Sequence, residues 1–130
     1  MPKKPNKSPE KYVLELPVDY KYFDMIVYEG KREEYRDIKP YWEKRLVDYK
    51  AIKRDYQALL TIAFLFFRFP PVDVCKEYPR GYTHVRFRKG YSKVTAEYPL
   101  VDIHFGEGRP EWGGVPGKRV FVIAFKDSEE

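Results

Sequence analysis

The densest group of chemically useful side chains lies in the segment from Gly30 to Arg36, which holds a lysine, two adjacent glutamates, a tyrosine and two arginines. Because alternate residues of a strand share a face, we expect Glu34 beside Arg36, with Lys31 on the opposite face. A carboxylate next to a guanidinium can orient a ligand's polar edge, and a lysine can bind phosphate or carry a proton. Lys31, Glu34 and Arg36 are therefore the candidate catalytic residues. The alternative is an ordinary solvated charged strand.

A second candidate group is the segment Arg86-Phe87-Arg88-Lys89-Gly90-Tyr91. Arg86 and Arg88 share one face of a predicted strand, and Tyr91 follows at a turn. Guanidinium groups bind phosphate in a fork, and an aromatic ring can stack on a base. The segment is equally typical of the polar outer face of an edge strand.

A third candidate is Trp112, which lies in a loop from Gly106 to Gly117 with five glycines and two prolines. Two interpretations stay open: the indole plugs the end of a barrel, or it lines a pocket against a base. The glycines do not follow a phosphate-loop pattern. The candidate nucleic-acid-binding residues are thus Lys31, Arg36, Arg86, Arg88, Tyr91 and Trp112.

Composition limits the classes of function. The 130 residues include 25 Lys and Arg against 20 Asp and Glu, a net charge of +5 that could attract a polyanion. The single cysteine, Cys75, forms no intrachain disulfide, and His84 and His104 lack a third metal ligand nearby. We therefore predict no metal and no cofactor. The longest apolar run, residues 58–67, is too short for a membrane span of about 20 residues, so we expect a soluble cytoplasmic protein.

The elements that must position these side chains follow from periodicity and from breaker residues. A polar tail with three prolines covers residues 1–10. A strand over Tyr12–Leu16 is expected to end at Pro17, and Asp19 and Gly30 frame a helix over Tyr20–Tyr28. An extended segment then carries the first candidate group, and Pro40 begins a second helix.

The middle of the chain is an insertion of about residues 50–79, within which apolar residues from Tyr56 to Phe69 recur at helical spacing on all sides. A helix of that kind must be covered by a partner, so Leu59–Phe69 is a possible homodimer surface or a lid; a buried strand is the competing prediction. The last third is β-structure, with predicted strands over Thr83–Arg88, Lys93–Tyr98, Leu100–Phe105 and Arg119–Lys126. The last strand is apolar on both faces and is expected to be central.

These motifs resemble those of the ASCH superfamily, a PUA-like β-barrel group. The family pattern is a glycine at a helix end, a lysine, and then Glu-x-Arg at the start of the second strand, which Lys31, Glu34 and Arg36 fit. A branch from bacteria and phages adds three further segments in the same order. These are similar to Asp37–Trp42, Arg86–Tyr91 and Gly108–Gly114. The resemblance covers roughly residues 12–125 without the insertion.

The resemblance implies an α+β fold, a mixed β-barrel with flanking helices and a helical insertion, in a single domain over residues 11–126. It also implies a module that binds RNA or a nucleotide in a basic, carboxylate-containing cleft. The alternative is a small hydrolase. Some relatives are amidohydrolases on modified cytidine that use Lys, Thr and Glu, but the threonine position falls at Glu34, and only Glu107 and Glu111 are candidates for the glutamate. Other relatives are ribonucleases.

Overall fold

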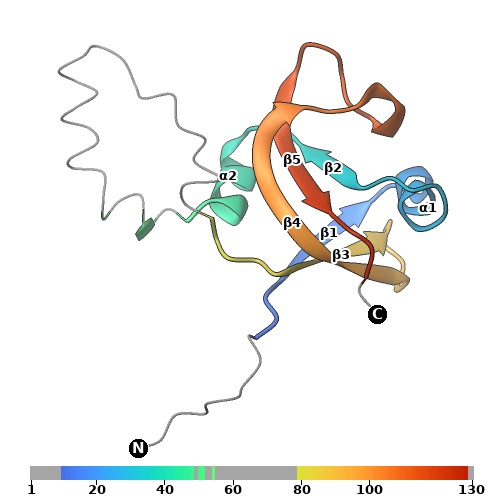
Figure 1. Cartoon of the computed structure of the whole chain (residues 1–130), viewed down its shortest axis with the longest axis horizontal. Helices are drawn as coiled ribbons and strands as arrows, with labels where there is room; N and C mark the ends of the chain where they lie inside the picture. Colours follow the sequence, from blue (N-terminus) through green and yellow to red (C-terminus); the bar gives the residue numbers. More distant parts are fainter. Residues whose placement is uncertain (1–9, 49, 52–53, 55–78, 129–130) are drawn as a thin grey trace, which may run out of the picture.

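The computed structural model describes residues 10–48, 50–51, 54 and 79–128. Within these ranges two helices and a strongly curled, mixed sheet of five strands form a half-barrel (Figure 1). The predicted α+β class, a barrel-like sheet with flanking helices, is confirmed. The predicted tail over residues 1–10 and the predicted insertion over 50–79, including the Leu59–Phe69 surface, lie almost entirely outside the described residues.

The described elements are, in chain order, β1 (Val13–Val18), α1 (Tyr20–Tyr28), β2 (Glu33–Arg36), α2 (Pro40–Leu46), β3 (His84–Lys89), β4 (Thr95–Glu107), the short 3-10 helix η1 (Pro110–Trp112) and β5 (Arg119–Phe125). The helix predicted over Tyr20–Tyr28 has those bounds. Asp19 stands at its N-cap position, but the Asp19 side chain makes no capping hydrogen bond. Gly30 has a φ of 78°, and this left-handed turn after the helix is why glycine suits the position.

The strands lie in the order β1-β3-β4-β5-β2, so β1 and β2 are the two edges of the sheet. The β1–β3 pair is parallel, and the other neighbours are antiparallel. As predicted, β5 is an inner strand, with Val120, Phe121, Val122 and Ile123 all buried. The helices lie at opposite sides of the view in Figure 1, and β2 leads from α1 toward α2.

The prediction that the first strand ends at Pro17 is wrong, because β1 includes Pro17 and continues to Val18. The physical reason is that β1 is an edge strand. Gly90 donates its N–H to the Val18 carbonyl on the side of β3, so the preceding residue directs its backbone groups away from β3. A proline there removes no hydrogen bond from the sheet.

The two strands predicted over Lys93–Tyr98 and Leu100–Phe105 are one strand, β4, of 13 residues. Its first half pairs with β3 and its second half pairs with β5, and the register shifts between Leu100 and Asp102. Pro99 lies next to this irregularity, and this proline is the reason that two separate strands were predicted. The bulge lets one strand curl and serve both halves of the sheet.

The core lies inside the curl of the sheet and is closed by α1 and α2. The alternation predicted for β3 holds, because Val85 and Phe87 are both fully buried. Phe23 and Ile26 on α1 and Leu46 on α2 pack into the same core cluster. Burial of these apolar side chains fixes the backbone that carries β2, and β2 carries the first candidate group.

Candidate functional site

Lys31 reaches the candidate site from the turn that follows α1. The backbone N–H groups of Glu29 and Lys31 both donate to the Met25 carbonyl, which wraps the chain around the end of the helix. Because β2 begins only at Glu33, strand alternation does not extend back to Lys31. The prediction that Lys31 lies on the face opposite Glu34 is therefore wrong.

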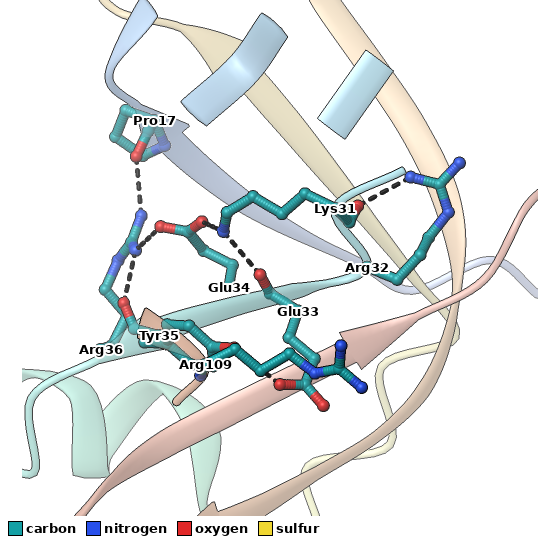
Figure 2. Close-up of polar contacts among 8 residues, drawn as sticks. All are labelled: Pro17, Lys31, Arg32, Glu33, Glu34, Tyr35, Arg36 and Arg109. Atoms are coloured by element: carbon teal, nitrogen blue, oxygen red, sulfur yellow. Dashed lines mark hydrogen bonds and ion pairs between the residues drawn. The ribbon is translucent and has the colours of Figure 1, made fainter. Parts of the chain in front are cut away.

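Lys31, Glu34 and Arg36 form one buried network, which we call the charged triad (Figure 2). The Lys31 Nζ atom lies 2.5 Å from Glu34 Oε1, and an Arg36 guanidinium nitrogen lies 2.5 Å from Glu34 Oε2. The predicted contact between Glu34 and Arg36 is thus present. Each carboxylate oxygen binds its own cation, so the triad carries two positive charges and one negative charge.

The same cations also bind backbone carbonyl groups. Lys31 donates to the Glu33 carbonyl at 2.6 Å. Arg36 donates to its neighbour's carbonyl at Tyr35 and, at 2.7 Å, to the carbonyl of Pro17 on β1. Figure 2 shows the Arg36 guanidinium between Glu34 and Pro17. The triad therefore links the two edges of the curled sheet.

The Lys31 side chain is the most deeply buried charged group described, with 0% of its surface exposed. Burial lowers the pKa of its ammonium group, and the Glu34 carboxylate opposes that shift. The Nζ atom lies 5.2 Å from the centre of the Tyr22 ring and 5.3 Å from that of Tyr35, so two aromatic rings flank the cation. Sequence reasoning missed Tyr22, because its place beside Lys31 depends on how α1 packs against β2.

The glycine-rich loop after β4 packs against these two rings. The Arg109 N–H donates to the Tyr35 hydroxyl at 2.9 Å, and that hydroxyl donates to the Glu33 carboxylate at 2.7 Å. A Cβ atom at Gly108 would come within 2.7 Å of the Tyr35 ring, and one at Gly113 within 2.8 Å of the Tyr22 hydroxyl. The absence of side chains at both glycines is what allows the loop to lie this close.

Trp112 lies in η1 of this loop and is partly exposed. The Arg109 guanidinium lies 4.7 Å from the centre of its ring. The loop thus brings Trp112 to the side of the molecule where Tyr22 and Tyr35 cover Lys31. The described contacts place the indole against Arg109.

The other predicted residues are placed differently. Arg86 forms ion pairs with Glu15 and Glu97, on the two strands beside its own, so its charge is already matched. Arg88 is exposed and stands opposite Pro17, the residue whose carbonyl binds Arg36. Tyr91 is fully exposed at the turn after β3. The structure therefore leaves Arg88 exposed on β3, next to β1, and holds Arg86 within the sheet's own ion pairs.

Arg32, which shares the triad's segment, has a structural role. It donates to the Ile26 carbonyl at 2.8 Å and to its neighbour's carbonyl at Lys31, and it pairs with Asp127. Its guanidinium also lies 5.2 Å from the centre of the Tyr98 ring. Arg32 therefore ties the end of α1 to the end of the sheet and leaves the triad to the other three charged residues.

A cavity of about 480 Å³ lies away from the triad. Its lining is mainly apolar and comprises Leu46, Pro79, Arg80, Gly81, Tyr82, Leu100, Val101, Asp102 and Ile103. None of the residues predicted for catalysis or binding lines it. Its volume is that of a small-molecule pocket, but the sequence gave no signal for it because its walls come from three separate parts of the chain.

In the described part of the chain, no group of three or more His, Cys, Asp or Glu side chains is arranged to hold a metal ion. Among the described helices, none has the length and apolar character needed to cross a membrane.

Comparison of the chain with protein-family models, curated proteins and solved structures finds no significant match. The class that the structure defines is the α+β half-barrel with a buried charged triad. The ASCH resemblance stays a prediction from sequence motifs.

Proposed function

We propose that this chain is an ASCH-like module that binds RNA or a nucleotide at the surface around the charged triad. The observation that carries the proposal is the triad's charge: two cations share one carboxylate in a mostly buried setting. A charge that is shielded from water acts over a longer range than an exposed one. An anionic ligand next to Arg36 would balance the excess positive charge.

Arg36 is the member of the triad that a ligand can reach, since 15% of its side chain is exposed while Lys31 is fully buried. Arg88 supplies an exposed second cation from the neighbouring strand region. The Arg36 guanidinium suits a phosphate, which arginine binds in a fork. The role of Lys31 is then to hold Glu34, and through Glu34 to orient Arg36.

Aromatic groups around the triad support a nucleic-acid ligand over a simple anion. Trp42 lies 5.2 Å from the Arg36 guanidinium, and Trp112 lies in the loop that covers Tyr35. Phosphate contacts give affinity, and stacking on aromatic rings holds unpaired bases. Tyr91, fully exposed, can add a further ring at the turn after β3.

The alternative, a small hydrolase on modified nucleosides or RNA, has one observation in its favour. Burial lowers the pKa of Lys31, as a proton-transfer role requires. Against it, the Lys31 ammonium donates to both Glu34 and the Glu33 carbonyl, so its protons are already bound. Glu34 is likewise held by a cation at each oxygen, which leaves no free base at the triad. The binding module is therefore the better-supported function.

The test is fluorescence anisotropy with labelled single-stranded RNA at several salt concentrations. Affinity should fall steeply with salt, and Arg36→Ala should weaken binding and reduce the salt slope by about one phosphate contact. Lys126→Gln is the matched control, since Lys126 is an exposed cation after β5, outside the triad and α2. Binding that is absent for every RNA and nucleotide tested, or equal in Arg36→Ala and Lys126→Gln, would contradict the proposal.

A second measurement separates binding from catalysis. The purified protein is incubated with RNA and with acylated cytidine, and the products are separated by chromatography. The binding module leaves both intact. Turnover that Lys31→Met and Glu34→Gln each abolish, in folded protein, would establish the hydrolase instead.

A further inference from the structure

A continuous row of arginines and aromatic rings runs from the charged triad across α2 to the start of β1 and β3. We call it the aromatic track. Its members, in order of contact, are Arg36, Trp42, Tyr41, Arg45, Tyr82, Tyr12 and Arg80. Only Arg36 among them was a candidate from the sequence, because the row joins three distant segments.

The first half of the track follows α2. The Arg36 guanidinium lies 5.2 Å from the centre of the Trp42 ring. Trp42 and Tyr41 meet edge to face with their ring centres 4.9 Å apart. The Arg45 guanidinium then lies 4.4 Å from the centre of the Tyr41 ring. Two neighbouring rings on α2 therefore lie between two guanidinium groups.

The second half crosses to the neighbouring strands. The Tyr82 hydroxyl donates to the Arg45 carbonyl at 2.8 Å. Tyr82 and Tyr12 stack with their ring centres 4.5 Å apart and an angle of 17° between the ring planes. The Arg80 guanidinium donates to the Tyr12 hydroxyl at 3.3 Å. This end of the track has two stacked rings with a guanidinium at their edge.

The track is accessible to a ligand. Tyr41 is 56% exposed and Tyr12 is 40% exposed, and Arg45 and Arg80 are exposed as well. Trp42 and Tyr82 are partly buried and pack against the core, so they are held in place. A platform with fixed inner rings and exposed outer rings loses little conformational freedom when it binds a flat ligand.

The cavity of about 480 Å³ opens at the far end of the track, since Arg80 and Tyr82 belong to both. This volume exceeds what a single nucleobase needs, and its mainly apolar walls suit a planar ring. Asp102, also in its lining, is a hydrogen-bond acceptor of the kind that receives an exocyclic amino group of a base.

We propose that single-stranded RNA lies along the aromatic track, with its phosphates toward Arg36, Arg45 and Arg80 and one unpaired base in the cavity. The inference rests on the proposed function and narrows its substrate class to unpaired strands. Duplex RNA cannot use the track, because its bases are stacked on each other and hide their faces from the rings. Positive groups combined with stacking rings are the usual means of binding a single strand.

The first test uses a Trp112→Phe background, which leaves Trp42 as the one tryptophan in the chain. A single-stranded oligouridine of ~12 nucleotides, long enough for a typical binding site, should quench Trp42 fluorescence on binding, and an A-form duplex of the same length should not. Equal affinity for both forms with unquenched Trp42 would overturn the track while leaving RNA binding itself in place. No binding of either form to the unaltered protein would remove the proposed function.

The second test compares exposed tyrosines on and off the track. Tyr41→Ala and Tyr12→Ala should each weaken binding of the oligouridine by about tenfold, the effect of losing one stacked base. Tyr28→Ala is the control, because Tyr28 is 78% exposed at the end of α1 and is not in the track, and α1 and α2 lie on opposite sides of the view in Figure 1. Affinities unchanged in the first two variants would contradict the inference.

A third test uses a matched pair of variants to examine the role of the cavity. Val101→Trp places a large ring at the lining of the cavity, and Val115→Trp places the same ring at a residue of nearly equal exposure, 55% against 56%, outside that lining. Only the Val101 variant should lose affinity, by about tenfold. Equal affinity in the two variants would exclude the cavity from the binding site.

Discussion

The guanidinium of Arg36 on β2 donates a hydrogen bond to the Pro17 carbonyl on β1, at 2.7 Å. These two strands are the opposite edges of the sheet. Arg36 therefore joins the ends of the curl where strand pairing does not. The carbonyl is free for this contact because proline directs its backbone groups away from β3.

Arg36→Ala is expected to lower the free energy of unfolding by about 2 to 4 kcal/mol, because it removes one partner of a largely buried ion pair. It also leaves the Pro17 carbonyl without its described donor. Urea unfolding measures the change. Arg86→Ala is the comparison, since the partly exposed Arg86 pairs should be worth only about 1 kcal/mol. Equal losses of unfolding free energy in the two variants would contradict a larger stabilising contribution from the Arg36 link between the two edge strands.

Glu34→Gln should be more destabilising than Lys31→Met, although both break the same ion pair. Without Glu34, the fully buried Lys31 ammonium loses the anion it is paired with, a loss of about 3 kcal/mol or more. Without Lys31, Glu34 keeps Arg36 and the loss is roughly 1 to 2 kcal/mol. The double variant should recover part of the loss, which a thermodynamic cycle detects. Additive losses would contradict the coupling.

The Glu34→Gln defect should also depend on pH. Burial already lowers the pKa of Lys31 below its ordinary value of 10.5, and Glu34 is the first group that opposes this. Between the folded and unfolded pKa values the unfolded chain binds the proton and the folded chain does not. The free energy of unfolding therefore rises with pH in that interval. The deficit of Glu34→Gln relative to the unaltered protein should shrink as pH approaches 10.5, as measured by urea unfolding at several pH values.

Tyr35 gives the opposite trend in alkaline solution. Burial is the main cause that raises its pKa above the ordinary value of 10.0. Above that pH the unfolded phenol ionises first, so the free energy of unfolding falls as pH rises through the folded pKa. Tyr35→Phe should reduce this slope by up to about 1.4 kcal/mol per pH unit, the value for one proton. Burial also raises the pKa of Tyr98, so Tyr98 continues to contribute to the fall of the unfolding free energy with pH in the variant. An unchanged slope in Tyr35→Phe would contradict the assignment.

The loop from Gly108 to Gly114 should tolerate no side chain at Gly114, where the backbone of Gly114 lies against that of Gly108. A Cβ atom at Gly114 would lie 2.2 Å from the carbonyl carbon of Gly108, and backbone cannot move aside cheaply. Gly114→Ala should therefore cost about 2 kcal/mol or more and free the loop from Tyr35. Gly106→Ala is the control, because its Cβ would meet an ordinary contact at 3.4 Å. Thermal unfolding and limited proteolysis of the loop measure both effects.

The segment between α2 and β3 should be replaceable without loss of the sheet. Val47 and Pro79 form an antiparallel bridge, so the two ends of the segment lie side by side. Replacing residues 50–77 by about six Gly and Ser residues changes the closure entropy little, since that entropy varies only with the logarithm of length. The shortened chain should keep its far-UV spectrum and cooperative unfolding. If Leu59–Phe69 forms the predicted homodimer surface, sedimentation should show the shortened chain as a monomer.

The sequence predicted an element correctly where the residues of that element alone determine it. Asp19 and Gly30 framed α1, and apolar residues on both faces marked β5 as an inner strand. Pro17 and Pro99 misled, because proline signals a break only where its missing N–H would have paired. Both occupy positions that the sequence alone does not distinguish from central ones.

The site depended on contacts that no local pattern contains. Glu34 and Arg36 were expected together from their spacing of two, and they are together. Lys31 was placed on the wrong face, because the start of β2 decides where alternation begins. The stack of Tyr12 on Tyr82 joins residues 70 positions apart, and only the parallel pairing of β1 with β3 creates it.

The length of β4 has a consequence for how the molecule opens. Every path of strand pairing from the parallel β1–β3 pair to the β5–β2 pair runs through this one strand. One half of the sheet detaches only if the β3–β4 or the β4–β5 pairing breaks, and both pairings are made by the same continuous strand. Amide protons of β4 on either side of that point should therefore exchange with solvent at similar, slow rates, because both halves open together in global unfolding.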